Sequence, residues 1–358
     1  MDMRGLSNKH IGLQGVIKFS SDIPYWTENS FKIPDQNSST FWYLGGSNIL
    51  FDGGGTIDGS GQVWWDAFPT NSSLLRPITL VIAESNGVVV QNIRQINGPN
   101  WMNLITDSKN VTFTNIDINV KSTSKNPIKN SDGWDIYPSS EIVIKDSVIL
   151  NGDDYSTNVL ISNLDCTGIH FVRFGISVGS LAQYPGVYDI VENVHIDEPH
   201  LTAKLNRNIK MADASDGARM KSRAGPNVGS GCVRNITHLN FWNHNVELPV
   251  TIDQTRLIDA LCYFTPADLC ASHPSNLLVD DIFYKNVTGT SSAAVVAQLK
   301  CSPGSRCGKI QLDDFLVKPG SGTAQYICQN VVFVLLFTFY VKLGGSSACL
   351  FGECAKTG

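Results

Sequence analysis

The chain has 358 residues, of which 42% are hydrophobic and 16% charged, and its formal net charge is −5. This length is sufficient for a large core, and a negative net charge without any Lys/Arg run argues against nucleic acid as a partner. The 31 glycines, together with frequent Asn, Ser and Thr, favour an all-β protein with many turns.

Cysteine and sequon usage indicates an oxidising compartment. Six of the nine cysteines form three close pairs, 262/270, 301/307 and 349/354, which is typical of secreted, disulfide-bonded proteins. No CxxC pair or His cluster accompanies them, so a zinc site is disfavoured. Residues 1–20 contain no apolar stretch that could form the core of a signal peptide. Because the cysteines nevertheless indicate secretion, we expect an extracellular protein whose start lies further upstream. Secretion also agrees with the five N-x-S/T sequons, at Asn37, Asn71, Asn110, Asn235 and Asn286.

Short runs of alternating apolar residues recur along the chain and predict strands of about 4–6 residues. They are NILFDGGGTIDG, GVVVQNIRQI, NVTFTNIDINV, EIVIKDSVIL, NVLISNLDCTG, DIVENVHID, VRNITHLNFW and NLLVDDIFYKNVTG. Comparable Val and Ile positions are 111 − 88 = 23, 142 − 111 = 31 and 159 − 142 = 17 residues apart. These intervals average close to one coil of a β-helix.

Asparagine recurs at the ends of these strands, and this distinguishes between fold classes. A sandwich or barrel also has short strands and turns, but neither explains the asparagines. In a solenoid, stacked Asn side chains hydrogen-bond from coil to coil. We therefore predict one solenoid domain over residues 1–358, without a linker.

The first part of the chain is rich in tryptophan. Aromatic rings suit the apolar faces of pyranose sugars. The alternative, which we favour, is that these side chains cover and cap the first coils. The residues concerned are Trp26, Trp42, Trp64, Trp65 and Trp101.

The stretch 130–154, NSDGWDIYPSSEIVIKDSVILNGDD, has carboxylates at both ends. Because 153 − 132 = 21 residues is about one coil, we expect Asp132 to lie beside Asp153 and Asp154 on one face. Crowded carboxylates raise the pKa of at least one of them. This gives a protonated acid beside ionised bases, as glycosidic hydrolysis requires. The alternative is that these are turn aspartates, but two such motifs one coil apart favour a site.

Two further motifs lie downstream. His170 is near the GISVGS turn, and Arg219 and Lys221 of GARMK share one strand face because they are two residues apart. An Arg and a Lys on one face suit a carboxylate ligand, Arg through its bidentate fork and Lys as a point charge. An ordinary solvated face is the alternative for this pair.

The motifs NSDGWD, NGDD, the His near GISVGS and GARMK, in this order, resemble glycoside hydrolase family 28, the polygalacturonases. FWYLGG, GGGTIDGSGQVWWDAF, ISVGSLAQY, DIVENV and VTIDQ extend the similarity over roughly residues 4–330. The motifs are most similar to those of fungal exopolygalacturonases.

The resemblance implies a single-domain, right-handed parallel β-helix that hydrolyses α-1,4-galacturonosidic bonds in pectin or polygalacturonate with inversion. Asp153 resembles the general acid that protonates the leaving oxygen. Asp132 and Asp154 resemble the pair that activates the attacking water, and His170 would tune the acid.

The same resemblance implies residues that bind the substrate. Arg219 and Lys221 would hold its carboxylate, while Asn130 and Tyr263 occupy positions similar to binding residues of the family. No metal and no cofactor are expected. We expect a monomer whose partner is the polysaccharide, without a membrane or nucleic-acid partner.

Several departures from the family pattern occur near the predicted chemistry. NGDDYSTNV lacks the Cys and strand expected after GDD, and 170 − 154 = 16 residues is short of one coil. FVRF, residues 171–174, separates His170 from the glycine that normally follows it.

Other departures lie elsewhere in the chain. Extra residues occur near Asp197–Leu205 and Thr255–Leu261. The apolar insert at 331–345 is too short to cross a membrane and is interpreted as a buried strand or C-terminal cap. We attribute the inserts and the gap to errors in intron assignment.

Other functions stay open. They are an endo-acting or xylogalacturonan-cleaving relative, a catalytically impaired β-helix that binds pectin, and a polysaccharide lyase whose aspartates hold Ca²⁺. The Arg-x-Lys strand with His170 favours hydrolysis over the lyase. A mildly acidic optimum is expected, since Asp153 must be protonated while Asp132 and Asp154 are ionised.

Overall fold

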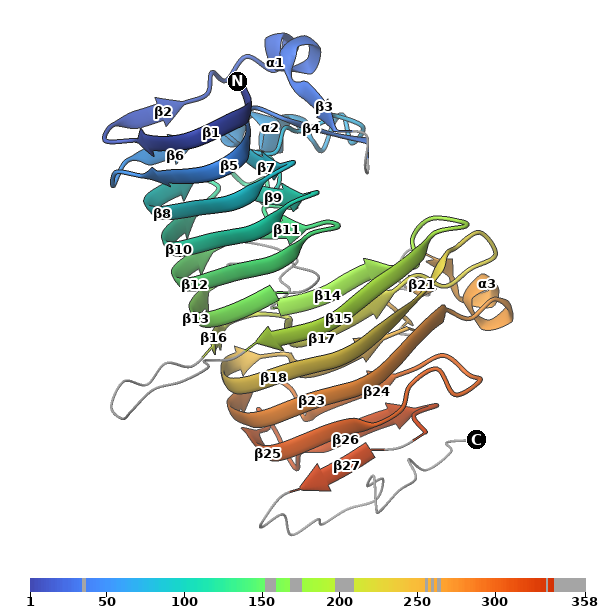
Figure 1. Ribbon diagram of the computed structural model, residues 1–358. Helices are drawn as coiled ribbons and strands as arrows, with labels where there is room; N and C mark the ends of the chain where they lie inside the picture. The colour runs from blue at the N-terminus through green and yellow to red at the C-terminus, as the bar shows by residue number, and fades with distance from the viewer. Residues whose placement is uncertain are drawn as a thin grey trace, which may run out of the picture. The chain divides into compact units, whose positions relative to one another are not determined.

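The computed structural model describes residues 1–33, 37–151, 159–167, 176–196, 209–254, 257–258, 261–262, 265–332 and 334–337. For residues 159–167, 257–258, 261–262 and 334–337 it describes the backbone. The chain forms two compact units, Met1–Arg173 and Phe174–Gly358. Within each unit, parallel strands stack in successive coils (Figure 1). The predicted all-β solenoid is thus confirmed, whereas a single domain over 1–358 stays a prediction.

Two columns of parallel strands form most of the first unit. The column of long strands contains β1 (Asp2–Gly12), β5 (Tyr43–Asp52), β8 (Asn86–Ile96), β10 (Lys109–Asn119), β12 (Ser140–Leu150) and β13 (Val159–Thr167). The column of short strands contains β7 (Leu80–Ala83), β9 (Asn103–Thr106) and β11 (Trp134–Ile136). The pairing of β5 with β7 joins the two columns in one hydrogen-bonded sheet. The other elements are β2 (Val16–Lys18), α1 (Ile23–Asn29), β3 (Phe31–Ile33), β4 (Ser38–Thr40), β6 (Thr56–Asp58) and α2 (Gln62–Ala67).

The strand register confirms the coil intervals predicted from the sequence. Val111 pairs with Val88 on one neighbouring coil and with Ile142 on the other, and Ile142 pairs with Val159. The side chains of Val88 and Val111 are 0% exposed and that of Ile142 is 1% exposed. Burial of each such side chain contributes about 1.5–3 kcal/mol. The core is therefore a set of apolar columns that run from coil to coil.

The predicted asparagine stacking is also present. Asn115 donates to the Oδ1 of Asn92 at 2.7 Å, and both residues have a positive φ, 54° and 53°. Asn is among the few non-glycine residues that adopt this left-handed conformation readily. Asparagine therefore turns the long strand and hydrogen-bonds the next coil. The described residues contain further rungs, Asn8–Asn48, Asn193–Asn235 and Asn240–Asn286.

Aromatic residues pack at the first coils. The ring of Phe41 stacks on Phe19 with centroids 4.4 Å apart and meets the edges of Trp26 and Trp64 at 4.6 and 6.4 Å. Trp42 and Trp64 are buried. For Trp26, Trp42 and Trp64 the structure agrees with the capping alternative.

The second unit also has long parallel strands, and its shorter strands form a separate parallel sheet. Its long-strand sheet contains β15 (Tyr188–Ile196), β16 (Ile209–Ala212), β18 (Ser230–Val246), β23 (Asn276–Ser291), β25 (Ile310–Lys318) and β27 (Val334–Phe337). Its second sheet contains β14 (Ile176–Leu181), β17 (Asp216–Ser222), β19 (Leu248–Asp253), β24 (Val295–Lys300) and β26 (Gln325–Gln329). The other elements are β20 (Leu257–Ile258), β21 (Leu261–Cys262), β22 (Thr265–Pro266) and α3 (Ala267–Ser272).

Two sequence interpretations can be checked in this unit. Within the apolar insert, Val334–Phe337 pairs in parallel with β25, so the strand interpretation is confirmed for these residues. Cys301 and Cys307, one of the close pairs, form a disulfide. Within the described residues, no helix is long and apolar enough to cross a lipid bilayer.

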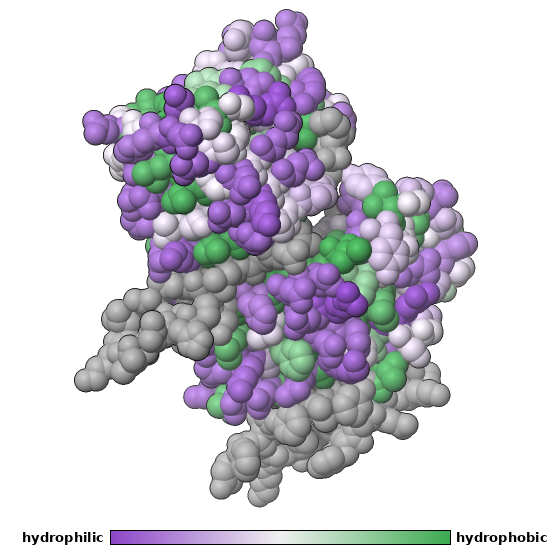
Figure 2. Space-filling view, in the orientation of Figure 1, coloured by the Kyte–Doolittle hydropathy of each residue, from purple (hydrophilic) through white to green (hydrophobic). Residues whose placement is uncertain are grey.

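The surface follows from the alternation of the strands. In β10, buried positions alternate with more accessible ones along most of the strand. Figure 2 shows the result on one face, where hydrophilic residues cover much of each unit and apolar residues occur in small groups. The outward positions are therefore mostly polar, as in a water-exposed solenoid.

A histidine lies in the core of the second unit. His238 is 0% exposed, and its ring stacks on Tyr284 of the next coil with centroids 4.8 Å apart. Among the described residues, neither ring nitrogen has a hydrogen-bond partner. Burial lowers the pKa of His238 to about 3 from the ordinary 6.5. The folded protein therefore holds a neutral imidazole.

This histidine makes stability pH-dependent. Between pH 6.5 and about 3 the unfolded state binds one proton more than the folded state, so stability falls as the pH falls, by up to about 4–5 kcal/mol. His238→Phe is expected to flatten this dependence, measured as the free energy of unfolding in urea at pH 7, 5.5 and 4. His244→Phe, at an exposed position of the same strand, is the control and should retain the wild-type slope. Equal slopes for all three proteins would contradict the expectation.

Candidate active site

The predicted site residues divide between described and undescribed parts of the chain. Asn130 and Asp132 belong to the first unit, and Arg219 and Lys221 to the second. Four other predicted residues, Asp153, Asp154, His170 and Tyr263, lie outside the described residues. The expected proximity of Asp132 to Asp153 and Asp154 therefore stays a prediction.

Asp132 lies at the end of the loop that enters β11, and the neighbouring coil fixes this end. The backbone N–H of Met102 donates to the carbonyl of Asp132 at 2.7 Å. The Asn103 side chain donates to the carbonyl of Gly133 at 2.7 Å and is itself held by two hydrogen bonds with Gln95. Asp132 is 4% exposed. The register of β9 and β11 thus places this carboxylate in a fixed, largely buried position.

Arg76 joins this loop to the preceding segment. Its Nη1 donates to the carbonyls of Pro99 and Lys129 at 2.9 and 2.6 Å, and its Nη2 donates to the Oδ1 of Asn130 at 2.8 Å. Burial lowers the pKa of Arg76 to about 10, while the charge of Asp132 opposes this shift. The guanidinium is therefore charged near neutral pH and favours the ionised form of Asp132. Our sequence reasoning missed Arg76, although a lone cation directly before an apolar strand was a visible signal.

Helix α2 holds the same loop further upstream. The Gln62 side chain bonds to Ser122, Thr123 and Ser124. The Asp66 carboxylate accepts hydrogen bonds from the side chains of Ser124 and Asn126. The hydrogen bond from Ser124 and, to a smaller extent, that from Asn126 hold the pKa of the Asp66 carboxyl below its ordinary value. The loop that leads to Asn130 and Asp132 is therefore anchored at both ends.

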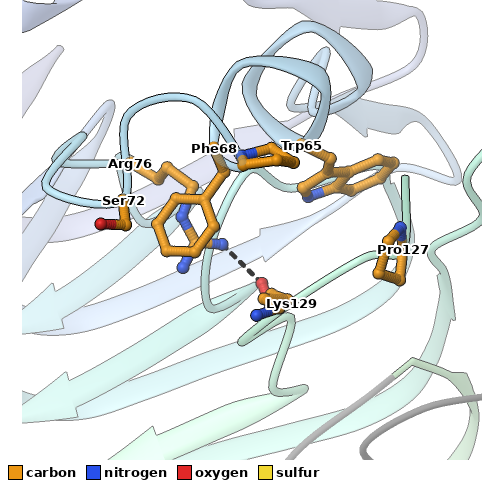
Figure 3. Close-up of a pocket in the computed structure, with 7 residues that line it drawn as sticks. Trp65, Phe68, Ser72, Arg76, Pro127 and Lys129 are labelled. Atoms are coloured by element: carbon orange, nitrogen blue, oxygen red, sulfur yellow. Dashed lines mark hydrogen bonds between the residues drawn. The ribbon is translucent and has the colours of Figure 1, made fainter.

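A pocket of about 350 Å³ opens between these two segments. Figure 3 shows Trp65 and Phe68, from α2 and the turn after it, on one side and Pro127 and Lys129 of the loop on the other. The Arg76 guanidinium lies 4.3 Å from the Phe68 ring centroid. Arg76 and Ser72 complete this part of the lining. Arg76, which holds Asn130, thus also lines the pocket.

In the second unit, Arg219 and Lys221 share one face of β17, as predicted. Arg219 is 0% exposed, and its guanidinium pairs with the carboxylates of Asp253 at 2.7 Å and Asp216 at 3.3 Å. Lys221 is 5% exposed and pairs in the strand register with Asp253 of β19. A buried guanidinium requires such counter-charges. Our sequence reasoning missed both carboxylates, although Asp253 follows Arg219 by about one coil.

A polar column crosses this face. Ser177, Arg219, Thr251 and Gln298 occupy matching positions on four successive strands. Within the described part of the chain, Ser177 Oγ, Thr251 Oγ1 and Gln298 Nε2 are buried without a hydrogen-bond partner. Buried polar atoms are costly unless water or a ligand satisfies them. The column therefore places buried polar atoms on both sides of Arg219.

Metal ligation has no visible basis in the described residues. No group of three or more His, Cys, Asp or Glu side chains is placed there to hold a metal ion. The Asp216–Arg219–Asp253 cluster already contains a cation.

These features define a parallel β-helix protein with carboxylates and cations along its short strands. The family model of glycosyl hydrolases family 28 matches residues 4–338. An exopolygalacturonase of Cochliobolus carbonum is 41% identical over an alignment of 350 residues, which covers 92% of this chain and 74% of that protein. A probable exopolygalacturonase X of Neosartorya fischeri is 41% identical, over an alignment that covers 90% of this chain and 75% of that protein.

The chain belongs to glycosyl hydrolases family 28, and its fold is the right-handed parallel β-helix of that family. The solved endo-xylogalacturonan hydrolase of Aspergillus tubingensis is 30% identical, with a TM-score of 0.76 and coverage of 90% of this chain and 82% of that one. A solved exopolygalacturonase of Thermotoga maritima shares the fold, with a TM-score of 0.66 at 16% identity and coverage of 94% of this chain and 81% of that one.

Arg76 gives a direct test of how the site loop is held. Arg76→Met removes the donor from three acceptors in a largely buried position and is expected to lower the free energy of unfolding by about 3 kcal/mol. Arg94→Met, at an exposed arginine that pairs with Asp117, is the matched control and should change it little. Equal unfolding midpoints in urea for the two variants would show that the Arg76 contacts are unimportant.

Proposed function

We propose that the chain hydrolyses α-1,4-galacturonosidic bonds of polygalacturonate or pectin, acting from a chain end and inverting the anomeric centre. The observation that carries this proposal is the identity of about 40% to proteins named exopolygalacturonase over about nine-tenths of the chain. Family membership and the anchored loop that bears Asp132 support it.

The catalytic roles follow from the chemistry of inversion. Asp153 gives its proton to the leaving glycosidic oxygen, while Asp132 and Asp154, both ionised, take a proton from the attacking water. An acid–base separation of about 6.5–9.5 Å leaves room for that water. His170 tunes the protonation of Asp153. The Arg76 guanidinium supports the role of Asp132, because it favours an ionised carboxylate there.

The binding roles concern the acidic sugar. Lys221 and Arg219 supply positive charge for its carboxylate, and Asn130 and Tyr263 hydrogen-bond its hydroxyl groups. Two aspartates already accept from the Arg219 fork. Arg219 therefore maintains the charge and shape of this face, and Lys221 contributes a second cation to it.

A second candidate is cleavage within xylogalacturonan. The observation in its favour is the 30% identity and TM-score of 0.76 to the endo-xylogalacturonan hydrolase. The higher identity to exopolygalacturonases makes this the less favoured function.

We further propose that the protein is a secreted, extracellular monomer. The Cys301–Cys307 disulfide supports an oxidising compartment. The mostly hydrophilic surface seen in Figure 2 is compatible with a protein that acts alone on a polysaccharide.

Product analysis tests the proposal. With polygalacturonate at about pH 5, the wild type is expected to release galacturonate monomer from the earliest times, and Asp153→Asn should lower the rate at least about 100-fold. Anion-exchange chromatography separates monomer from oligomers. A ladder of oligomers would indicate endo action. Absence of release by the wild type would reject the proposed hydrolysis and favour the catalytically impaired, pectin-binding alternative.

A further inference from the structure

The pocket beside the Asp132 loop combines positive charge with an apolar lining. Its volume of about 350 Å³ is within the range of small-molecule sites, about 300–1,000 Å³. Two lining residues, Arg76 and Lys129, are cationic, and none of the lining residues in the described part of the chain is acidic. This is notable in a protein of net charge −5.

The two cations have different surroundings. The Arg76 guanidinium is 7% exposed and donates to two carbonyls and to Asn130. Lys129 is exposed, and its ammonium lies over the Phe68 ring, 5.6 Å from the ring centroid. An ammonium offers three donors that can turn toward a ligand. Lys129 is therefore the cation available to an incoming anion, and Arg76 adds positive field behind it.

The rest of the lining suits a sugar ring. Phe68 is half-buried and Pro127 is exposed, and Figure 3 shows them on opposite sides of the pocket. Aromatic and proline rings pack well against the C–H face of a pyranose. The exposed hydroxyl of Ser72 adds a hydrogen-bonding group at the rim. An anionic group on an amphipathic ring is the combination that these residues match.

We propose that this pocket is a subsite for one galacturonate residue of the substrate chain, with Lys129 as the partner of its carboxylate. This inference rests on the proposed function and adds to it a residue that determines specificity. Lys129 directly precedes Asn130, and Arg76 bonds to both. A uronate held in the pocket therefore lies beside the loop that bears Asp132. A methyl-esterified sugar lacks the negative charge that Lys129 recognises, and the pocket discriminates against it.

Ligand-observed NMR titrations test the subsite with galacturonate, its methyl ester and galactose as probes. The wild type is expected to bind galacturonate most tightly. Lys129→Gln should weaken that binding about five- to tenfold and remove the preference over the ester, because it removes one charge-assisted contact. Lys125→Gln, an exposed lysine of the same loop outside the pocket lining, is the matched control and should bind as the wild type does.

A second pair of variants separates the pocket from the other cationic face. Lys221→Gln should still bind galacturonate through Lys129. The double variant, with Lys129→Gln added to Lys221→Gln, should lose this binding. Equal affinities of Lys129→Gln and Lys125→Gln, or equal binding of galacturonate and galactose by the wild type, would overturn the subsite. Hydrolysis of polygalacturonate is assayed separately. A wild type that binds galacturonate through Lys129 but hydrolyses nothing would refute the proposed function and leave the subsite standing.

Discussion

Parallel hydrogen bonding between successive coils decides which residues of this chain become neighbours. In the first unit it places Val88, Val111 and Ile142 in one column although they are 23 and 31 residues apart in sequence. Coils of unequal length still keep this register, because each extra residue is accommodated in a loop and the paired strands are unchanged. The same pairing aligns β9 with β11 and so fixes where the Asp132 loop ends. Apolar columns stabilise the stack, and asparagine rungs repeat the alignment between several neighbouring coils.

Two buried arginines show how the fold accommodates charge near the candidate site. Arg76 is surrounded by carbonyl oxygens and one amide, with Asp132 acting on it through its charge. Arg219 instead pairs with two carboxylates of its own face. In the first arrangement neutral acceptors hold the guanidinium and Asp132 acts on it through space, whereas in the second two carboxylates bond to it directly. Both guanidinium groups are buried and already held by the protein, so we assign the recognition of a uronate carboxylate in the pocket to the exposed Lys129.

Periodic features could be predicted from the sequence, and contacts that depend on loop paths could not. Strand alternation, the Val and Ile intervals and the asparagine rungs repeat with the coil, and all were predicted. Arg76 and the partners of Arg219 were missed, because which side chain meets a buried guanidinium depends on how each coil closes. The alternation of strands predicted that Arg219 and Lys221 share a face. The two carboxylates around Arg219 come from β19, through its register, and from Asp216, the first residue of β17. Asp153, Asp154, His170 and Tyr263 lie outside the described residues, so their roles stay predictions.

The stereochemistry of the first product tests the central claim most directly. If Asp132 and Asp154 activate water while Asp153 protonates the leaving oxygen, a single displacement converts the α-linkage into β-galacturonate. Proton NMR of a fast digest, recorded before the anomers equilibrate, distinguishes the two forms by their anomeric signals. The account predicts that the β-anomer appears first and the α-anomer follows by mutarotation. Initial release of the α-anomer would contradict it, because retention requires a covalent intermediate on a closely placed nucleophile.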